Sequence, residues 1–273
     1  MQLASHPIGR LFQSVVIKFG SLSVQPLSAL GRYVLFCLQV FRCAVSRSWD
    51  FRLLFQQMEF VGIRSFWIIV LAAMMIGAVF GIQFGQIFKL FGIEAMIGAA
   101  ASFALSRELA PIVGAFLVTG RAGSAMAAEI ATMKVNEQLD AMRVMSVNPV
   151  HYLVVPRVMA SILMMPFLTA FFIIVGVASS YIIGILLFQI DEGIFFTQMR
   201  WITQPKHVLQ GMQKAMVFGF IISTVGCYSG FFSSGGAKGV GASTTTAVVV
   251  SLVAVLVSDF FISYIQIQGS SVF

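Results

Sequence analysis

The chain has 273 residues, of which 59% are hydrophobic and only 10% are charged, and its mean hydropathy is +0.95. This composition excludes a water-soluble domain. Hydrocarbon leaves only helices and closed barrels able to satisfy the backbone, and the apolar runs lack the two-residue alternation of barrel strands. We therefore expect an all-α polytopic membrane protein. The net charge of +7 comes from basic residues that flank apolar segments, which indicates membrane orientation and no nucleic-acid partner.

The sequence contains no recognisable pattern of catalytic or metal-binding residues. Cys37, Cys43 and Cys227 have neither metal-ligand spacing nor an even count, so we expect no metal site and no disulfide framework. The sequence has no GxxxxGK[ST] phosphate loop, and its three histidines fall outside the expected spans. The N-terminus also lacks the apolar core and cleavage site of a signal peptide. The chain is predicted to move or hold something rather than to be an enzyme.

Residues 1–60 are predicted to form an N-terminal surface segment and an interfacial helix. Residues 1–32 contain several helix breakers, among them Pro7, Gly20 and Pro26. From residue 33 to 57, apolar side chains alternate at helical spacing with arginines and give one oily and one basic face. A helix of that kind lies in the membrane interface rather than crossing it.

Residues 61–273 are predicted to form the transmembrane domain. Its five spans are expected at about residues 63–88, 95–119, 153–187, 208–232 and 244–267. In the first span, Gly77, Gly81 and Gly85 repeat every four residues, a spacing that lets another helix approach closely or that allows a bend in a lipid-facing helix. Between the spans we expect a tight turn at 89–94, an interfacial turn at 188–206 and a glycine-rich turn at 233–243.

A polar stretch at residues 121–157 interrupts the apolar sequence. From about residue 127 to 145, apolar and charged residues alternate with helical periodicity, which predicts one amphipathic helix that Asn148 and Pro149 end. Such a helix between two spans lies along or just outside the membrane face. It is either a connector that rests in the headgroups or a surface that a soluble protein can reach.

Lysine and arginine are distributed unevenly about the spans. Of the 17, twelve fall on the side of the N-terminus and the amphipathic connector, Arg107 lies within a span, and four fall on the other side. Those four are Lys89, Arg200, Lys206 and Lys214. Because basic residues concentrate on the cytoplasmic side, this predicts a cytoplasmic N-terminus and an outward-facing C-terminus.

Four charged residues fall inside or at the edge of the expected spans. Arg107 and Glu108 lie in the second span, Lys214 near the start of the fourth and Asp259 in the fifth. A charge at a helix centre costs on the order of 3 kcal/mol, so we expect these side chains to face protein, water or a polar ligand. Arg107 and Glu108 are either part of a binding site or a mutually neutralised structural pair, and the partner of Asp259 is left open.

Two segments resemble the MlaE permease family of lipid ABC transporters. The first is the ungapped run SRELAPIVGAFLVTGRAGSAMAAEIATMKVNEQLDAMRVMSVNPVHYLVVPRVMA at residues 106–160, and the second is GAKGVGASTTTAVVVSLVAVLVSDFF at residues 236–261. The layout of apolar segments extends the resemblance over essentially everything after residue 35. One departure is that many relatives carry arginines before the fifth span where this chain has Ala242 and Thr246, so this turn is less basic.

The resemblance implies an inner-membrane permease of bacteria with two membranes. It implies a homodimer with an N-terminal elbow helix and five spans per subunit, and a cytoplasmic coupling helix between the second and third spans. The implied partners are an MlaF-type ATPase that binds ATP and Mg, a periplasmic hexamer of MlaD-type MCE proteins and, in many systems, an MlaB-type STAS protein. The implied substrate is phospholipid moved between inner and outer membranes, which maintains outer-membrane lipid asymmetry. No cofactor is expected in this chain.

The resemblance also assigns site residues. The coupling helix is expected to sit in a groove of the ATPase, and the positions assigned to that contact are Glu129, Met133, Glu137 and Asp140. Replacing Glu129 by lysine is expected to uncouple the ATPase without unfolding the permease. The lipid pocket is expected at the dimer interface, between the first, second and fifth spans. The residues assigned to it are Phe80, Ile87, Phe88, Phe91, the RELxP residues Arg107, Glu108 and Leu109, and the charges Lys214 and Asp259.

Two other functions are compatible with the residues alone. In an ion-coupled secondary carrier, Arg107, Glu108 and Asp259 would form the relay; inverted repeats would favour that mechanism, and the sequence contains no internal repeat. A structural anchor for a periplasmic complex would leave the intramembrane charges without a role.

Overall fold

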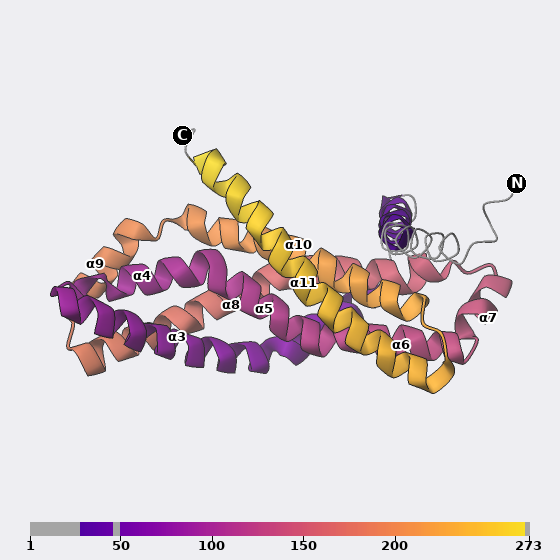
Figure 1. Cartoon of the computed structure of the whole chain (residues 1–273), viewed down its shortest axis with the longest axis horizontal. Helices are drawn as coiled ribbons and strands as arrows, with labels where there is room; N and C mark the ends of the chain where they lie inside the picture. Colours follow the sequence, from indigo (N-terminus) through magenta and orange to yellow (C-terminus); the bar gives the residue numbers. More distant parts are fainter. Residues whose placement is uncertain (1–27, 46–49, 271–273) are drawn as a thin grey trace, which may run out of the picture. The chain divides into compact units, whose positions relative to one another are not determined.

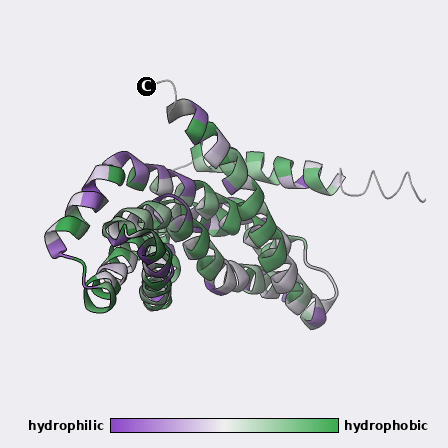
Figure 2. Cartoon of the chain, turned by 60° about the vertical axis from the view of Figure 1, so that its left-hand side comes forward, coloured by the Kyte–Doolittle hydropathy of each residue, from purple (hydrophilic) through white to green (hydrophobic). Residues whose placement is uncertain are grey.

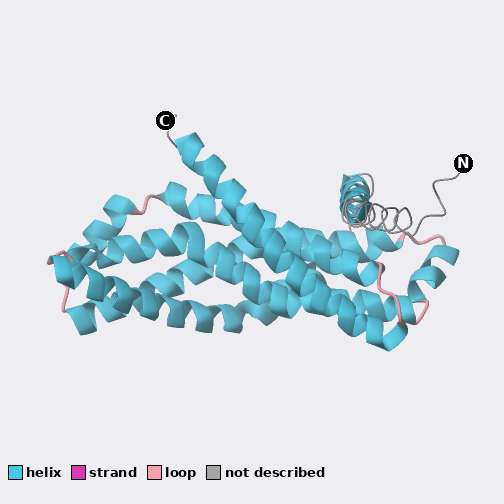
Figure 3. Cartoon of the chain, in the orientation of Figure 1, coloured by secondary structure: helices cyan, strands magenta, loops and turns pink. Residues whose placement is uncertain are grey.

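The structure is a computed structural model that describes residues 28–45 and 50–270. In these ranges the chain is helical with short connections and contains no strand (Figure 3). The chain divides into two compact units, Met1–Arg47 and Ser48–Phe273. The first unit contributes the helix Ser28–Val45, and most of the surface segment expected at residues 1–32 lies outside the described residues.

The second unit contains long helices interrupted by short turns of different pitch (Figure 1). Four of these turns, η1, η3, η4 and η5, are π-helical, whereas η2 is a 3-10 turn. The elements in order are α2 (Phe51–Met58), η1 (Glu59–Ile63), α3 (Arg64–Phe91), η2 (Glu94–Met96), α4 (Ile97–Ala104), η3 (Leu105–Leu109), α5 (Ala110–Val118), η4 (Thr119–Gly123), α6 (Ser124–Val135), α7 (Gln138–Val144), η5 (Val150–Val154), α8 (Val155–Phe188), α9 (Glu192–Ile202), α10 (Pro205–Phe231) and α11 (Gly236–Ser270).

The described residues contain six helical runs that are long and apolar enough to cross a membrane. They are Ser28–Val45, Phe51–Phe91, Glu94–Val135, Val150–Phe188, Pro205–Phe231 and Gly236–Gln268. The last five correspond to the five expected spans, which confirms an all-α polytopic membrane protein. The first covers much of the expected interfacial helix. Figure 2 shows that the long helices are apolar along most of their length, as a bilayer requires.

The glycines of α3 lie against α8. A Cβ on Gly77 would stand 2.1 Å from the carbonyl oxygen of Gly176, and one on Gly85 would meet the ring of Phe188. The two backbones therefore touch where both helices lack a side chain, which is the packing that small residues allow between membrane helices. The expectation that the glycine repeat faces a neighbouring helix is confirmed. Around this contact, Ile69, Leu105 and Phe172 form part of the buried core.

The helix expected at residues 33–57 was wrong as one element. The backbone is extended at Asp50, whose carboxylate accepts the backbone N–H of Arg52 and caps a new helix, α2, that begins at Phe51. From there α2, η1 and α3 form one run, Phe51–Phe91. The boundary drawn near residue 60 falls inside this run.

The single amphipathic helix expected at residues 127–145 is also wrong. The second span continues to Val135, and Glu137, with φ 57°, breaks the helix before α7 starts at Gln138. Ser146, with φ 62°, follows the end of α7. Asn148 does not stop this helix but starts the next one, because its side-chain oxygen accepts the backbone N–H of Val150 at 3.0 Å.

The three other connections differ in how well they match the turns expected from the sequence. The turn at 89–94 is confirmed, since α3 ends at Phe91 and Gly92 adopts the left-handed conformation that ends many helices. The turn expected at 188–206 is mostly the helix α9, which Asp191 caps through the N–H of Ile194. The glycine-rich turn at 233–243 is short, because α11 already begins at Gly236.

We expect Gly77→Ala to lower the thermal unfolding midpoint in detergent by about 5 °C, since the added Cβ forces α3 and α8 apart. The matched control is Gly120→Ala, where a Cβ meets nothing within 4 Å and where alanine favours the helix. Equal midpoints for Gly77→Ala and the wild type would contradict the close α3–α8 contact.

Candidate functional site

The second span carries its charges on a helical irregularity. Proline at position 111 lacks an N–H, and its ring would clash with the carbonyl group of Arg107 in a regular α-helix. The chain widens into the π turn η3 just before it, in which the N–H of Ala110 bonds to the carbonyl of Leu105. Arg107 and Glu108 lie in this turn.

Helix α10 passes very close to η3. A Cβ on Gly211 would stand 2.1 Å from the carbonyl oxygen of Ser106, so only glycine permits this approach. Lys214 follows three residues later, on the same face of α10 as Gly211. The Gly211 contact thereby brings the lysine stem alongside the carboxylate of Glu108.

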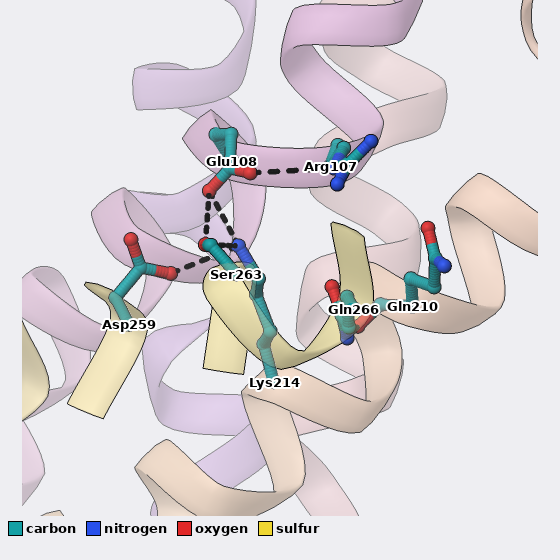
Figure 4. Close-up of polar contacts among 7 residues, drawn as sticks. All are labelled: Arg107, Glu108, Gln210, Lys214, Asp259, Ser263 and Gln266. Atoms are coloured by element: carbon teal, nitrogen blue, oxygen red, sulfur yellow. Dashed lines mark hydrogen bonds and ion pairs between the residues drawn. The ribbon is translucent and has the colours of Figure 1, made fainter. Parts of the chain in front are cut away.

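The ammonium of Lys214 joins three helices (Figure 4). It donates to the Glu108 carboxylate from η3 and, at 2.7 Å, to the Ser263 hydroxyl from α11, and it lies 3.0 Å from Oδ1 of Asp259. The contacts with Glu108 and Ser263 are hydrogen bonds, whereas the contact with Asp259 is an ion pair, because its Oδ1 has no hydrogen-bond partner in the described part of the chain. The Lys214 side chain has no exposed surface. This supplies the partner of Asp259 that the sequence left open.

The α11 side of the cluster is a polar stripe on an apolar helix. Asp259, Ser263 and Gln266 follow one another at spacings of four and three, which places them on one face. Gln266 donates to the backbone carbonyl of Gln210 at 3.2 Å, one turn before Lys214 (Figure 4). Sequence reasoning singled out Asp259 alone, although this spacing was available as a signal.

Arg107 completes the cluster. Its Nε lies 3.5 Å from Oε1 of Glu108, and its guanidinium carbon lies 5.7 Å from the centroid of the Phe103 ring. Its Nη2 is buried and has no hydrogen-bond partner in the described part of the chain. Arg107, Glu108, Lys214 and Asp259 carry two positive and two negative charges, so the site, which we call the charged cluster, is formally neutral.

The residues of the charged cluster differ in how much of each side chain is exposed. Glu108 keeps 37% of its side chain exposed, whereas Arg107 keeps 15% and Lys214 none. Lys214 is therefore not on the membrane surface, where the count of basic residues put it, and it meets a lipid headgroup only by giving up a partner. Leu109, the other residue of the motif, packs against the core.

The apolar residues assigned to the pocket form a separate row on α3. Phe84 lies between Phe80 and Phe88, at ring-centroid distances of 5.5 and 6.0 Å. Ile87 and Phe91 are exposed. Phe88 packs instead on the small core around Ile97 and Phe195. In residues 28–45 and 50–270, no hydrogen bond, ion pair or ring contact joins this row to the charged cluster.

At the other end of the second span, Glu129 is not a free surface charge. Its carboxylate accepts a 2.8 Å hydrogen bond from Arg157 of α8, whose side chain is only 5% exposed. A lysine at position 129 would face this buried guanidinium, so Glu129→Lys is now expected to destabilise the protein as well as to uncouple the ATPase, and the uncoupling itself stays a prediction. Glu137 and Asp140 are exposed, and Met133 is half-buried.

A second contact fixes the same end, and sequence reasoning missed it. Lys134 donates to the backbone carbonyl of Phe231 at 2.8 Å, at the C-terminal end of α10, and lies 6.0 Å from the Phe232 ring centroid. A lysine there satisfies a carbonyl that the helix leaves free. The end of α6 is thus tied to both α8 and α10.

Comparison with known proteins decides the family. The family model described as Permease MlaE matches residues 54–265. The chain belongs to the MlaE permease family. A probable ABC transporter permease protein of Synechocystis sp. is 46% identical over 215 residues, which cover 79% of this chain and 82% of the relative. One of Rickettsia felis is 36% identical over 244 residues, covering 89% and 94%.

A plant protein is also similar. The Arabidopsis thaliana protein TRIGALACTOSYLDIACYLGLYCEROL 1, chloroplastic, is 42% identical over 215 residues, which cover 79% of this chain but 61% of the plant protein. Together these matches confirm that the chain is a multi-pass membrane protein and an ABC transporter permease, a subunit that works with an ATPase and does not itself hydrolyse ATP.

We expect Lys214→Met to destabilise the protein by ~3 kcal/mol, because it leaves Glu108 and Asp259 facing each other without a cation. The double variant Lys214→Met, Asp259→Asn is expected to recover most of the loss, since it removes one positive and one negative charge and keeps the Arg107–Glu108 pair. Thermal unfolding in detergent measures both, with Lys206→Met, at an exposed lysine, as control. A double variant no more stable than the single one would contradict mutual neutralisation.

Proposed function

We propose that this chain is the membrane subunit of an ATP-driven transporter that moves phospholipid between the inner and outer membranes of a bacterium and thereby maintains outer-membrane lipid asymmetry. The observation that carries the proposal is membership of the MlaE permease family combined with a neutralised charged cluster inside the membrane. The similarity to a plant protein named for a galactolipid supports a lipid as substrate. The ABC permease relatives favour ATP over an ion gradient as energy source.

The lipid site is proposed at the charged cluster. Glu108 is its most accessible member and is therefore the group available to a polar headgroup, whereas the unpaired Nη2 of the neighbouring Arg107 is buried. Lys214 then acts as the internal counter-charge that holds Glu108 in place, and Asp259 pairs with the same ammonium. The exposed apolar side chains near the end of α3, Ile87 and Phe91, supply a surface for acyl chains.

A homodimer is proposed through the faces of α3 and α11. Only 11% of the most apolar stretch of helix α11 is buried within the chain. Figure 1 shows that α11 crosses the bundle at an angle and that its C-terminal part leads away from it. Phe260, Phe261 and Tyr264 are exposed beside Asp259. A second copy packed on this face would enclose the charged cluster between two subunits, which is where a lipid site between protomers would lie.

The end that carries α7 is proposed to contact an MlaF-type ATPase on the cytoplasmic side, with ATP and Mg bound by that partner. Seven of the twelve basic residues between positions 50 and 270 flank this end, which supports an inner-membrane orientation with a cytoplasmic N-terminus and a periplasmic C-terminus. On the opposite side an MlaD-type MCE hexamer is proposed, and an MlaB-type STAS protein joins the ATPase in many such systems. Ala242 and Thr246 are exposed on α11, so this chain offers no positive charge there.

Co-purification of the tagged chain from its native membrane tests this proposal, with mass spectrometry of the proteins and lipids retained. An ATPase, an MCE protein and bound phospholipid are the expected finds. Recovery of the chain alone and free of lipid would overturn the proposal and favour an ion-coupled carrier. A parallel preparation of Glu108→Gln is expected to keep the proteins but to retain less phospholipid, with Glu192→Gln on α9 as the control.

We expect Asp140→Arg to reduce stimulation of the partner ATPase on the order of tenfold while leaving the unfolding midpoint unchanged. The side chain of Asp140 is 67% exposed and pairs only with Arg143 of its own helix, an exposed pair worth less than ~1 kcal/mol. ATPase rates of the assembled complex in nanodiscs provide the measurement. Glu192→Arg, an exposed charge reversal on α9, is the control, and equal loss in both variants would count against α7 as the contact.

A further inference from the structure

A cavity of about 740 Å³ lies beneath α9, on a different side of η3 from the charged cluster. Its walls come from α8 and α10, and Ser102 of α4 and Ser106 of η3 form its floor. Helix α9 connects the end of α8 to the start of α10 (Figure 1). Its side chains Phe195, Phe196 and Met199 line the cavity. Ser106 and Glu108 stand two residues apart in η3, so they point to roughly opposite faces of that turn.

The lining of the cavity is unsuited to water. It is almost entirely apolar and contains no aspartate or glutamate. Of its few hydroxyl groups, Ser102 and Thr203 bond to each other at 2.6 Å, and the Oγ of Ser106 is buried without a partner among the described residues. The cavity therefore suits an apolar occupant.

The cavity opens toward the surroundings of the bundle between α8 and α10. Ile174 of α8 and Leu209 of α10 line it and are 64% and 57% exposed. In a membrane, the apolar molecules that reach such an opening are lipid acyl chains. The volume lies within the range of ~300–1,000 Å³ that is usual for small-ligand sites.

The cation at the rim matches the charge of a phospholipid. Arg200, in the last turn of α9, lines the cavity and makes no ion pair within residues 28–45 and 50–270. The next residue, Trp201, is 73% exposed, as is usual for aromatic residues at the membrane–water boundary. Lipid phosphates lie at this boundary, and a guanidinium binds phosphate through paired N–H groups.

We propose that each subunit binds one phospholipid in this cavity, with an acyl chain between α8 and α10 beneath α9 and its phosphate on Arg200. This site is separate from the lipid site proposed at the charged cluster. The inference goes beyond the proposed function, because it requires only that the chain lies in a phospholipid bilayer, and its test does not depend on transport.

Photo-crosslinking tests the site directly. The full-length chain, with the partners that co-purify, is placed in nanodiscs of phosphatidylethanolamine and phosphatidylglycerol that contain phosphatidylglycerol with a diazirine on one acyl chain. After irradiation, mass spectrometry locates the lipid on the protein. Adducts are expected on the segments that line the cavity in α8, α9 and α10. Adducts spread evenly over all lipid-facing helices would overturn the proposal. So would adducts on a helix of a partner protein in place of those on α8, α9 and α10.

Two variants sharpen the result. Ala178→Trp fills the cavity and Arg200→Glu reverses the charge at its rim, and each is expected to reduce these adducts about tenfold. The controls are Leu186→Trp, at an exposed position of α8, and Lys206→Glu, in the first turn of α10. Neither residue lines the cavity. Unchanged adducts in both variants would leave only annular lipid and refute the site.

A probe without phosphate separates the two halves of the proposal. Diacylglycerol with the same diazirine chain is expected to lose its adducts in Ala178→Trp but to keep them in Arg200→Glu. If Arg200→Glu reduces both probes equally, the assignment of the phosphate to Arg200 is wrong. Because Arg200 lies near the membrane surface, this variant keeps the test valid even if the tryptophan in Ala178→Trp prevents folding.

Discussion

One ammonium group without exposed surface determines how three helices of this chain meet. An unpaired charge in hydrocarbon is costly, so Lys214 must keep its bonds to Glu108, Asp259 and Ser263. Those partners come from η3 and α11, which fixes the rotation of each helix about its axis. The constraint matters most for α11, because this helix buries little of itself against the rest of the chain. Its polar stripe, together with the buried Ala247 and Val255, sets its register.

The backbone around the charged cluster is shaped by two residues that carry no charge. Pro111 prevents a regular helix and η3 forms before it, while Gly211 removes the side chain that would hold α10 away from the carbonyl of Ser106. A π turn changes the direction of side chains within one helix, so neighbouring residues reach different surroundings. Here Ser106 faces the cavity beneath α9 and Glu108 faces Lys214. Two proposed lipid sites thus share one short turn.

The sequence predicted the fold class, the five spans and the packing role of Gly77 because these follow from hydropathy and from local spacing. It also singled out all four charges of the cluster, since a charge in an apolar run is conspicuous. The prediction from sequence failed where a single backbone angle decides whether a helix continues. This is the case at Glu137, whose positive φ splits the expected coupling helix. It failed again where a partner lies far along the chain: the Arg157 that holds Glu129, and the Phe231 carbonyl that holds Lys134, are contacts that no periodicity encodes.

Those distant contacts give the second span a mechanical role in the proposed transporter. The run Glu94–Val135 is one continuous helical segment, and Glu108 and Glu129 are separated by about 20 residues, or ~30 Å of helix. Its end is held to α8 by the Glu129–Arg157 pair and to α10 by Lys134. A displacement imposed on α7 therefore moves three helices together, and two of them carry members of the charged cluster, Glu108 and Lys214. Because packed helices resist bending, we expect such a displacement to be passed along the second span through the π turns η4 and η3, the second of which holds Glu108.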